Sequence, residues 1–183
     1  MSRSLRSTDL KRLHREWRRQ APGRAALLLD SVATPYNVGS ILRTAAAMRV
    51  DDVWLCGQTA AETHAGTQKT ALGSQRFLNV HHGEDPGVAL DEVRAGGYRI
   101  VGLELADGAE PIHAVDLTGA VCLAVGHEDR GLSAAVLDGA DGLAFIPQLG
   151  RIGSLNVATA TAIALYETRR QGWPPAGPDQ TAL

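Results

Sequence analysis

Three segments of this 183-residue chain place polar side chains among turn residues, in spacings that suit a ligand site. Arginine holds phosphate oxygens through charge-assisted hydrogen bonds, and the free backbone N–H groups at the start of a helix favour polar or anionic ligand atoms. Amide and carboxylate side chains in the same segments can orient such groups. In chain order, the polar side chains are those of Asn37, Arg43, Glu128, Ser154 and Asn156.

The elements that must position these residues alternate between apolar runs of strand length and segments with helical periodicity. This alternation predicts an α/β fold with a mostly parallel sheet and helices on both faces. Ligands bind beyond the carboxyl ends of the strands in such sheets, and each polar segment follows a predicted strand. The predicted strands are 25–29, 53–56, 77–80, 99–103, 121–125 and 143–146, and the predicted helices are 8–20, 37–48, 88–95, 132–137 and 155–171. Residues 58–75 are small and polar, so we expect a functional loop there.

The composition is that of one globular domain, with 44% hydrophobic and 21% charged residues. We divide the chain into a basic helical extension (1–23), an α/β domain (24–171) and a flexible tail (172–183). No apolar run approaches the roughly 20 residues of a membrane span, and the start lacks a signal-peptide pattern. We therefore expect a cytoplasmic protein without a membrane partner. Cys56 and Cys122 lie in apolar runs and are interpreted as reduced core residues; no Cys/His spacing predicts a metal site.

The charge of the chain is unevenly distributed. Residues 1–24 contain eight Lys/Arg and two Asp/Glu, whereas residues 25–183 contain ten and eighteen. A basic arm on an acidic body indicates either a polyanionic partner or a solvated chain start. The predicted helix 8–20 has a narrow apolar stripe, which favours docking on a surface. The candidate nucleic-acid contacts are four cations of this helix and one of the predicted loop 58–75: Arg12, Arg15, Arg18, Arg19 and Lys69. His64, His81 and His82 are interpreted as surface residues.

The three segments together resemble the motifs of the SpoU (TrmH-type) RNA 2′-O-ribose methyltransferases, within the SPOUT superfamily. The first contains the Asn-x-Gly-x-x-x-Arg core from Asn37 to Arg43. The second is Gly-x-Glu-x-x-Gly-Leu from Gly126 to Leu132, and the third combines Ile146-Pro147 with Ser154-Leu155-Asn156. The three motifs occur in the family's order over roughly residues 25–170. The segment 69–73 also resembles an RNA-facing part of the family, and His127 stands where Ser, Asn or Ala is more usual.

The resemblance implies a fold and a chemistry that the residues alone do not. The family has a C-terminal deep trefoil knot, binds S-adenosylmethionine and pairs as homodimers whose RNA sites borrow from both subunits. It implies that Arg43 lies against the target ribose and phosphate, in a catalytic set with Asn37, Glu128, Ser154 and Asn156. The expected cofactor contacts are Leu103, Gly126, Ile146 and Leu155.

The expected substrate is structured RNA, with tRNA favoured because the chain carries no separate RNA-binding domain. Ribosomal RNA is the alternative substrate, and a non-catalytic RNA-binding module of the same fold is a second class. A dinucleotide-dependent oxidoreductase is disfavoured, because no Gly-x-Gly-x-x-Gly follows the first predicted strand.

Overall fold

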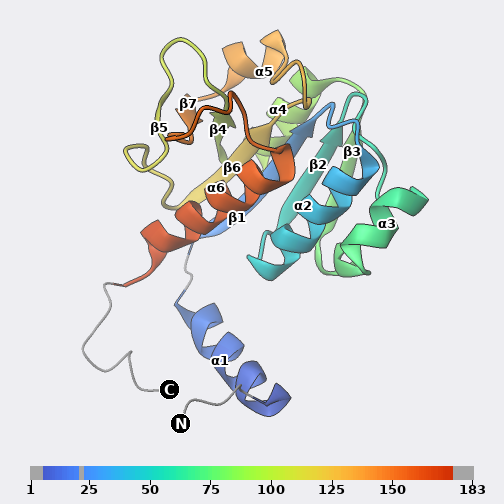
Figure 1. Ribbon diagram of the computed structural model, residues 1–183, viewed down its shortest axis with the longest axis vertical. Coiled ribbons are helices and arrows are strands. Elements are labelled where there is room, and N and C mark those ends of the chain that lie inside the picture. The colour runs from blue at the N-terminus through green and yellow to red at the C-terminus, as the bar shows by residue number, and fades with distance from the viewer. Residues whose placement is uncertain (1–5, 21–22, 175–183) are drawn as a thin grey trace.

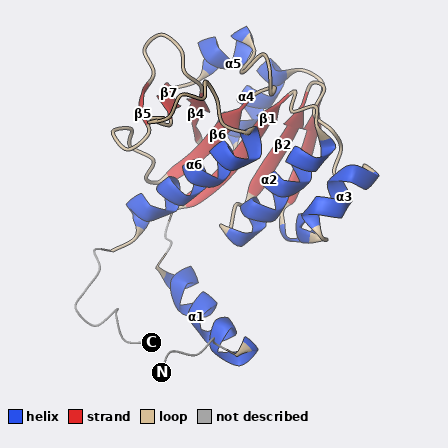
Figure 2. Ribbon diagram, viewed as in Figure 1, coloured by secondary structure: helices blue, strands red, loops and turns tan. Residues whose placement is uncertain are grey.

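The computed structural model describes residues 6–20 and 23–174 and shows one seven-stranded parallel sheet flanked by helices (Figures 1 and 2). The strand order is β3-β2-β1-β6-β4-β7-β5, and every pairing is parallel. The strands are β1 (Arg24–Asp30), β2 (Asp52–Cys56), β3 (Asn79–Gly83), β4 (Arg99–Leu103), β5 (Glu110–Pro111), β6 (Ala120–Val125) and β7 (Gly142–Phe145). The helices are α1 (Ser7–Arg19), α2 (Pro35–Ala47), α3 (Ala65–Ala71), the 3-10 turn η1 (Ser74–Phe77), α4 (Pro86–Ala95), α5 (Ala134–Gly139) and α6 (Val157–Gly172). The predicted α/β class with a parallel sheet is therefore confirmed.

The central strands are buried on both faces, which explains their continuous apolar sequences. In β1, Leu27 and Leu29 pack into the core that α2 and α6 cover, whereas Ala26 and Leu28 pack into the core under α4 and α5. Figure 1 shows α2, α3 and α6 on the near face and α4 and α5 behind the sheet. Cys56 and Cys122 are free and buried, as expected of core residues.

The prediction of a loop over 58–75 was wrong for half of the segment, which is helical: α3 covers 65–71 and η1 begins at Ser74. His64 begins α3 by accepting a hydrogen bond from the N–H of Gly66 at its Nδ1, so this histidine is a helix cap. The sequence is short and polar, and α3 is stabilised mainly by packing on α2 rather than by intrinsic helix propensity. The next strand begins two residues later than predicted, and the two-residue strand β5 was not predicted.

Helix α1 lies apart from the α/β body, at the end of the molecule where β1 begins (Figure 1). Its docking contact is small: the Trp17 ring lies 5.0 Å from that of Trp173 after α6, and Arg49 donates to the Arg18 carbonyl. Trp17 and Leu10 remain 40% exposed, so the body covers only part of the apolar stripe. Within residues 6–20 and 23–174, no helix has the length and apolar character needed to cross a membrane.

The buried Arg169 ties the end of α6 to the rest of the sheet. Its guanidinium donates to the carbonyls of Gly23, Met48 and Arg49, which lie before β1 and after α2. The segment that leads into β1 and the segment between α2 and β2 are thereby fixed to the last helix. The trefoil knot that the resemblance implies stays a prediction.

Candidate active site

A chain of hydrogen bonds joins the three motifs at the carboxyl edge of the sheet. The Asn37 side chain donates to Glu128 Oε1 at 2.8 Å, and its own Oδ1 accepts from Asn156 Nδ2 at 3.0 Å. Asn156 also caps α6, because its Oδ1 accepts from the backbone N–H groups of Ala158 and Thr159. Each amide thus uses both its donor and its acceptor, which fixes its orientation and links loops about 90 and 120 residues apart in the sequence.

Glu128 is held as a carboxylate. Partial burial opposes its ionisation, but donation from Asn37 and from the turn at Thr34 outweighs burial and lowers the pKa of Glu128 to about 2. The backbone N–H groups of Ala33 and Thr34 bind its two oxygens at 3.2 and 3.1 Å. A carboxylate with this pKa is a poor proton acceptor at neutral pH, so the geometry assigns Glu128 to positioning.

A cavity of about 560 Å³ opens beside this chain of hydrogen bonds, a size typical of small-molecule sites. Its walls are the loops that follow β4, β6 and β7 and the start of α6. All four residues expected to contact the cofactor line it, namely Leu103, Gly126, Ile146 and Leu155, and so do Ser154, Glu128 and His127.

Gly126 is required by the close folding of its loop. A Cβ on Gly126 would lie 2.2 Å from the backbone of Gly131 and 2.3 Å from the Leu132 nitrogen. The loop closes through paired backbone hydrogen bonds of 2.9 Å between His127 and Gly131. The ring of His127 serves the same loop, because its Nδ1 accepts from the N–H of Asp129 at 3.0 Å.

Two further carboxylates hold this loop, and neither was predicted from the sequence. Glu104, which lines the cavity, accepts from the N–H of Leu132 at 3.1 Å, and the buried Asp30 accepts from that of Ser133 at 2.7 Å. Each is an acidic residue at the carboxyl end of an apolar strand. That position is the sequence signal that could have identified both.

Arg43 lies away from the cavity that its own chain forms. It is exposed on α2 and is not a wall of the cavity. Gly39, one turn earlier on the same side of the helix, faces α3: a Cβ there would lie 2.2 Å from the Thr67 carbonyl oxygen. The structure therefore brings Asn37, Glu128, Ser154 and Asn156 to one edge, whereas Arg43 is exposed on α2 and is not part of the cavity wall.

The candidate RNA contacts are all exposed but lie in two places. Arg12, Arg15, Arg18 and Arg19 lie on α1, and Lys69 lies on α3, beside α2. Arg12 lies 3.9 Å from Glu16, an exposed pair of the kind that contributes little to stability.

The parallel sheet, the capped α6 and the pocket where three loops converge at the carboxyl edge are typical of the class of α/β proteins that bind small ligands at this edge. The sequence profile of the SpoU rRNA Methylase family matches residues 24–166. The chain therefore belongs to the SpoU family, which confirms the resemblance seen in the three motifs.

Individual relatives agree with this assignment. The chain is 36% identical over 149 residues to the 23S rRNA (guanosine(2553)-2′-O)-methyltransferase RlmP of Bacillus subtilis, covering 81% of this chain and 59% of that protein. It is 32% identical over 146 residues to the tRNA (guanosine(18)-2′-O)-methyltransferase of Escherichia coli, covering 78% of this chain and 62% of that one. The crystal structure of an AdoMet-bound rRNA methyltransferase from Sinorhizobium meliloti superimposes with a TM-score of 0.76 at 34% identity, covering 81% and 56% of the two chains. The chain thus spans about three fifths of the length of the curated relatives that it matches.

Proposed function

We propose that this protein transfers the methyl group of S-adenosylmethionine to a ribose 2′-hydroxyl of structured RNA. The observation that carries the proposal is the convergence of all three family motifs on one edge of the sheet beside the cavity, where Asn37 donates to Glu128 and accepts from Asn156. The relatives named above act on rRNA or tRNA, and both remain candidate substrates. We favour tRNA, with the protein acting in the cytoplasm.

The cavity suits this cofactor in size and in charge. Leu103, Ile146 and Leu155 offer apolar contact, while the closed loop at Gly126 exposes backbone to a ligand. The carboxylates of Glu104, Glu128 and Asp129 in the walls outnumber the single guanidinium of Arg130, which favours a cationic sulfonium. When bound, the cofactor supplies an activated methyl group.

Arg43 is the proposed contact to the substrate. Its guanidinium would hold the phosphate of the target nucleotide and stabilise the alkoxide that develops as the hydroxyl loses its proton. A phosphate oxygen or a water molecule would accept that proton, since both carboxylate oxygens of Glu128 are already engaged by Asn37 and by the N–H groups of Ala33 and Thr34. Asn37 and Asn156 fix the start of α6 relative to the Glu128 loop through their hydrogen bonds.

We further propose a homodimer, which supplies what one chain lacks. Arg43 is exposed and does not line the cavity of its own chain, so the arginine of one subunit would face the cavity of the other. Helix α1 lies at the edge of the sheet where β1 begins (Figure 1), opposite the carboxyl ends whose loops line the cavity. Its cations would therefore bind RNA backbone far from the methylated nucleotide.

The direct test is incorporation of tritiated methyl groups from S-adenosylmethionine into bulk tRNA and, separately, rRNA. We expect Arg43→Ala to lower transfer by about 10²-fold or more, the usual cost of losing a group that stabilises developing charge. Its affinity for the cofactor should be unchanged. Arg94→Ala, on the opposite face of the sheet, is the matched control and should keep its activity. RNA binding without any incorporation by the wild-type protein would instead favour the non-catalytic module.

The role of α1 is tested by its salt dependence. Replacing Arg12, Arg15, Arg18 and Arg19 with glutamine should weaken RNA binding. The slope of log affinity against log salt should flatten by about 0.7–0.9 for each phosphate that the variant no longer neutralises. An unchanged slope would exclude α1 from the RNA surface.

A further inference from the structure

The surface beside α2 differs in charge from the rest of the α/β body. The 21 residues from Thr63 to Gly83 contain no Asp or Glu, although the chain has 20 acidic residues. The same stretch contains Lys69 and Arg76, both exposed. Within the described part of the chain, carboxylates from outside the stretch contact only its β3 end, where Asp52 pairs with His81 and Glu62 with His82. On a body with a net negative charge, Lys69 and Arg76 thus mark the part of this stretch that favours a polyanion.

Two large apolar side chains stand out from this acid-free surface. Phe77 is 67% exposed and Leu72 is 66% exposed. The guanidinium carbon of Arg76 lies 4.7 Å from the centroid of the Phe77 ring, so a cation already covers part of the aromatic surface. An exposed aromatic ring paired with arginine is the combination with which proteins stack unpaired bases.

This surface is fixed to the helix that carries Asn37 and Arg43. Helix α3 approaches α2 so closely at Gly39 that any side chain there would collide with it. The Thr70 hydroxyl adds a hydrogen bond of 3.0 Å to the Tyr36 carbonyl, and η1 also packs on α2. The backbone that carries Phe77 is therefore packed on α2, which limits the backbone entropy lost when a ligand binds.

We infer that Phe77 and Arg76 form a stacking platform for an unpaired base of the RNA substrate, with Lys69 contacting the adjoining backbone. This inference rests on the proposed function and adds that the nucleotides near the target are single-stranded. Charge favours RNA over a second copy of this acidic chain as the occupant, because an acid-free cationic surface gains from phosphates. The Arg76–Phe77 pair supplies two flat faces, which suits a base better than an aliphatic side chain.

The test measures RNA binding without relying on turnover. The probes are an RNA hairpin with an unpaired loop that carries 2-aminopurine and a blunt duplex of the same stem. Phe77→Ala should weaken binding of the hairpin by about 5- to 100-fold, because stacking on an aromatic ring is worth about 1–3 kcal/mol per base. Binding of the duplex should change far less, and the quenching of 2-aminopurine should be lost. Phe77→Tyr should restore both the affinity and the quenching.

Controls distinguish base stacking from a general loss of apolar surface and from a subunit contact. Val88→Ala removes an exposed apolar side chain from α4, across the sheet, and should leave hairpin affinity unchanged. Equal hairpin affinity of Phe77→Ala and wild type would overturn the inference, and so would a change of oligomeric state in sedimentation, which would assign Phe77 to a subunit contact. If wild type transfers methyl groups while Phe77→Ala binds RNA normally, only the platform fails. If wild type transfers none, the proposed function fails instead.

Discussion

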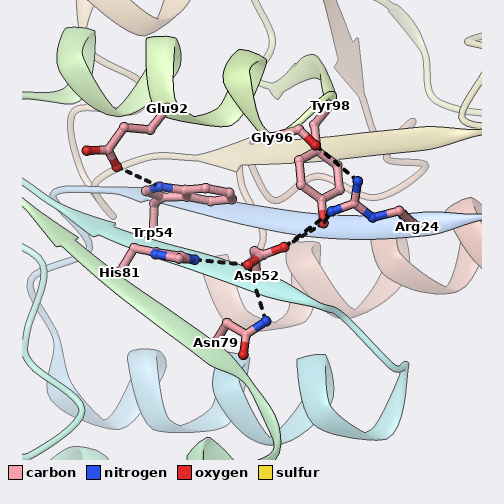
Figure 3. Close-up of polar contacts among 8 residues, drawn as sticks. All are labelled: Arg24, Asp52, Trp54, Asn79, His81, Glu92, Gly96 and Tyr98. Atoms are coloured by element: carbon pink, nitrogen blue, oxygen red, sulfur yellow. Dashed lines mark hydrogen bonds and ion pairs between the residues drawn. The ribbon is translucent and has the colours of Figure 1, made fainter.

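Two polar networks occupy opposite edges of the same sheet. They differ in whether a cavity lies beside them. At the amino edge, Asp52 accepts from Tyr98 at 2.6 Å and contacts His81 at 2.9 Å, and Arg24 bonds both Tyr98 and the Gly96 carbonyl (Figure 3). At the carboxyl edge, Asn37 bonds Glu128 and Asn156, and Glu128 lines a cavity of about 560 Å³.

The amino-edge network is directed inward. Arg24, Asp52 and Asn79 begin β1, β2 and β3, and Tyr98 lies just before β4. Trp54 stacks on His81 with 4.6 Å between ring centroids and donates to Glu92, which closes the network further. Only 16% of the Asp52 side chain is exposed. The charged and aromatic groups of this network thus form their hydrogen bonds with one another, and these bonds link neighbouring strands of the sheet. A polar cluster indicates a ligand site only when, as at the carboxyl edge, it borders empty space.

The largest contrast is expected in activity. Asn37→Ala breaks the link between Glu128 and Asn156, which should shift the two loops and lower methyl transfer by about 10²-fold, the scale of a misplacement of about 1 Å in a site. Thermal unfolding should change little by comparison. Normal transfer by this variant would show that the bridge is not part of the functional site.

Asp52→Asn should show the opposite pattern. It removes a buried charge that four neighbours contact, and hydrogen bonds to charged groups contribute about 1.5–3 kcal/mol each. The free energy of unfolding, measured by urea denaturation, should fall by roughly that amount, while transfer below the melting temperature stays at the wild-type level. Lost activity in a folded Asp52→Asn protein would erase the distinction between the edges.

Acid should affect both edges. Burial raises the pKa of Asp52 and that of Glu128, but hydrogen bonds outweigh burial and lower both. The ordinary pKa of Glu128 is 4.5. Groups with a lowered folded pKa stabilise the protein above their unfolded pKa, and this contribution is lost as pH falls through the folded value. The urea midpoint should therefore decrease from about pH 5 down to about pH 2. Glu128→Gln and Asp52→Asn should each flatten that decrease, and an unchanged profile in both would contradict the assigned hydrogen bonds.

Much of the sheet was predictable because buried parallel strands have continuous apolar sequences. β4, for example, was placed at its observed bounds, 99–103. Helix α3 was missed because its seven residues carry little periodic signal and depend on a glycine of another helix, Gly39, for their place. His81 was interpreted as a surface residue, but it stacks on Trp54 through strand pairing that no local pattern reveals.

The site followed from motif residues, whereas its geometry did not. The positions of Asn37, Glu128 and Asn156 were predicted, but the direct bonds between them depend on loops that meet only after folding. Nothing local in the sequence places Arg43 outside its own cavity or encodes the threading of a knot. The loop supports Asp30 and Glu104 were overlooked because an acidic residue at the end of a strand can equally be solvated.

Binding of S-adenosylmethionine, measured by calorimetry, tests the cavity most directly. We expect one site per wild-type chain and at least about tenfold weaker binding by Gly126→Ala, whose added methyl group collides with the backbone at Gly131 and forces the loop apart. Asp52→Asn, at the other edge, should bind as wild type does. Equal affinity of wild type and a folded Gly126→Ala protein would contradict the account, as would a wild-type chain that does not bind the cofactor.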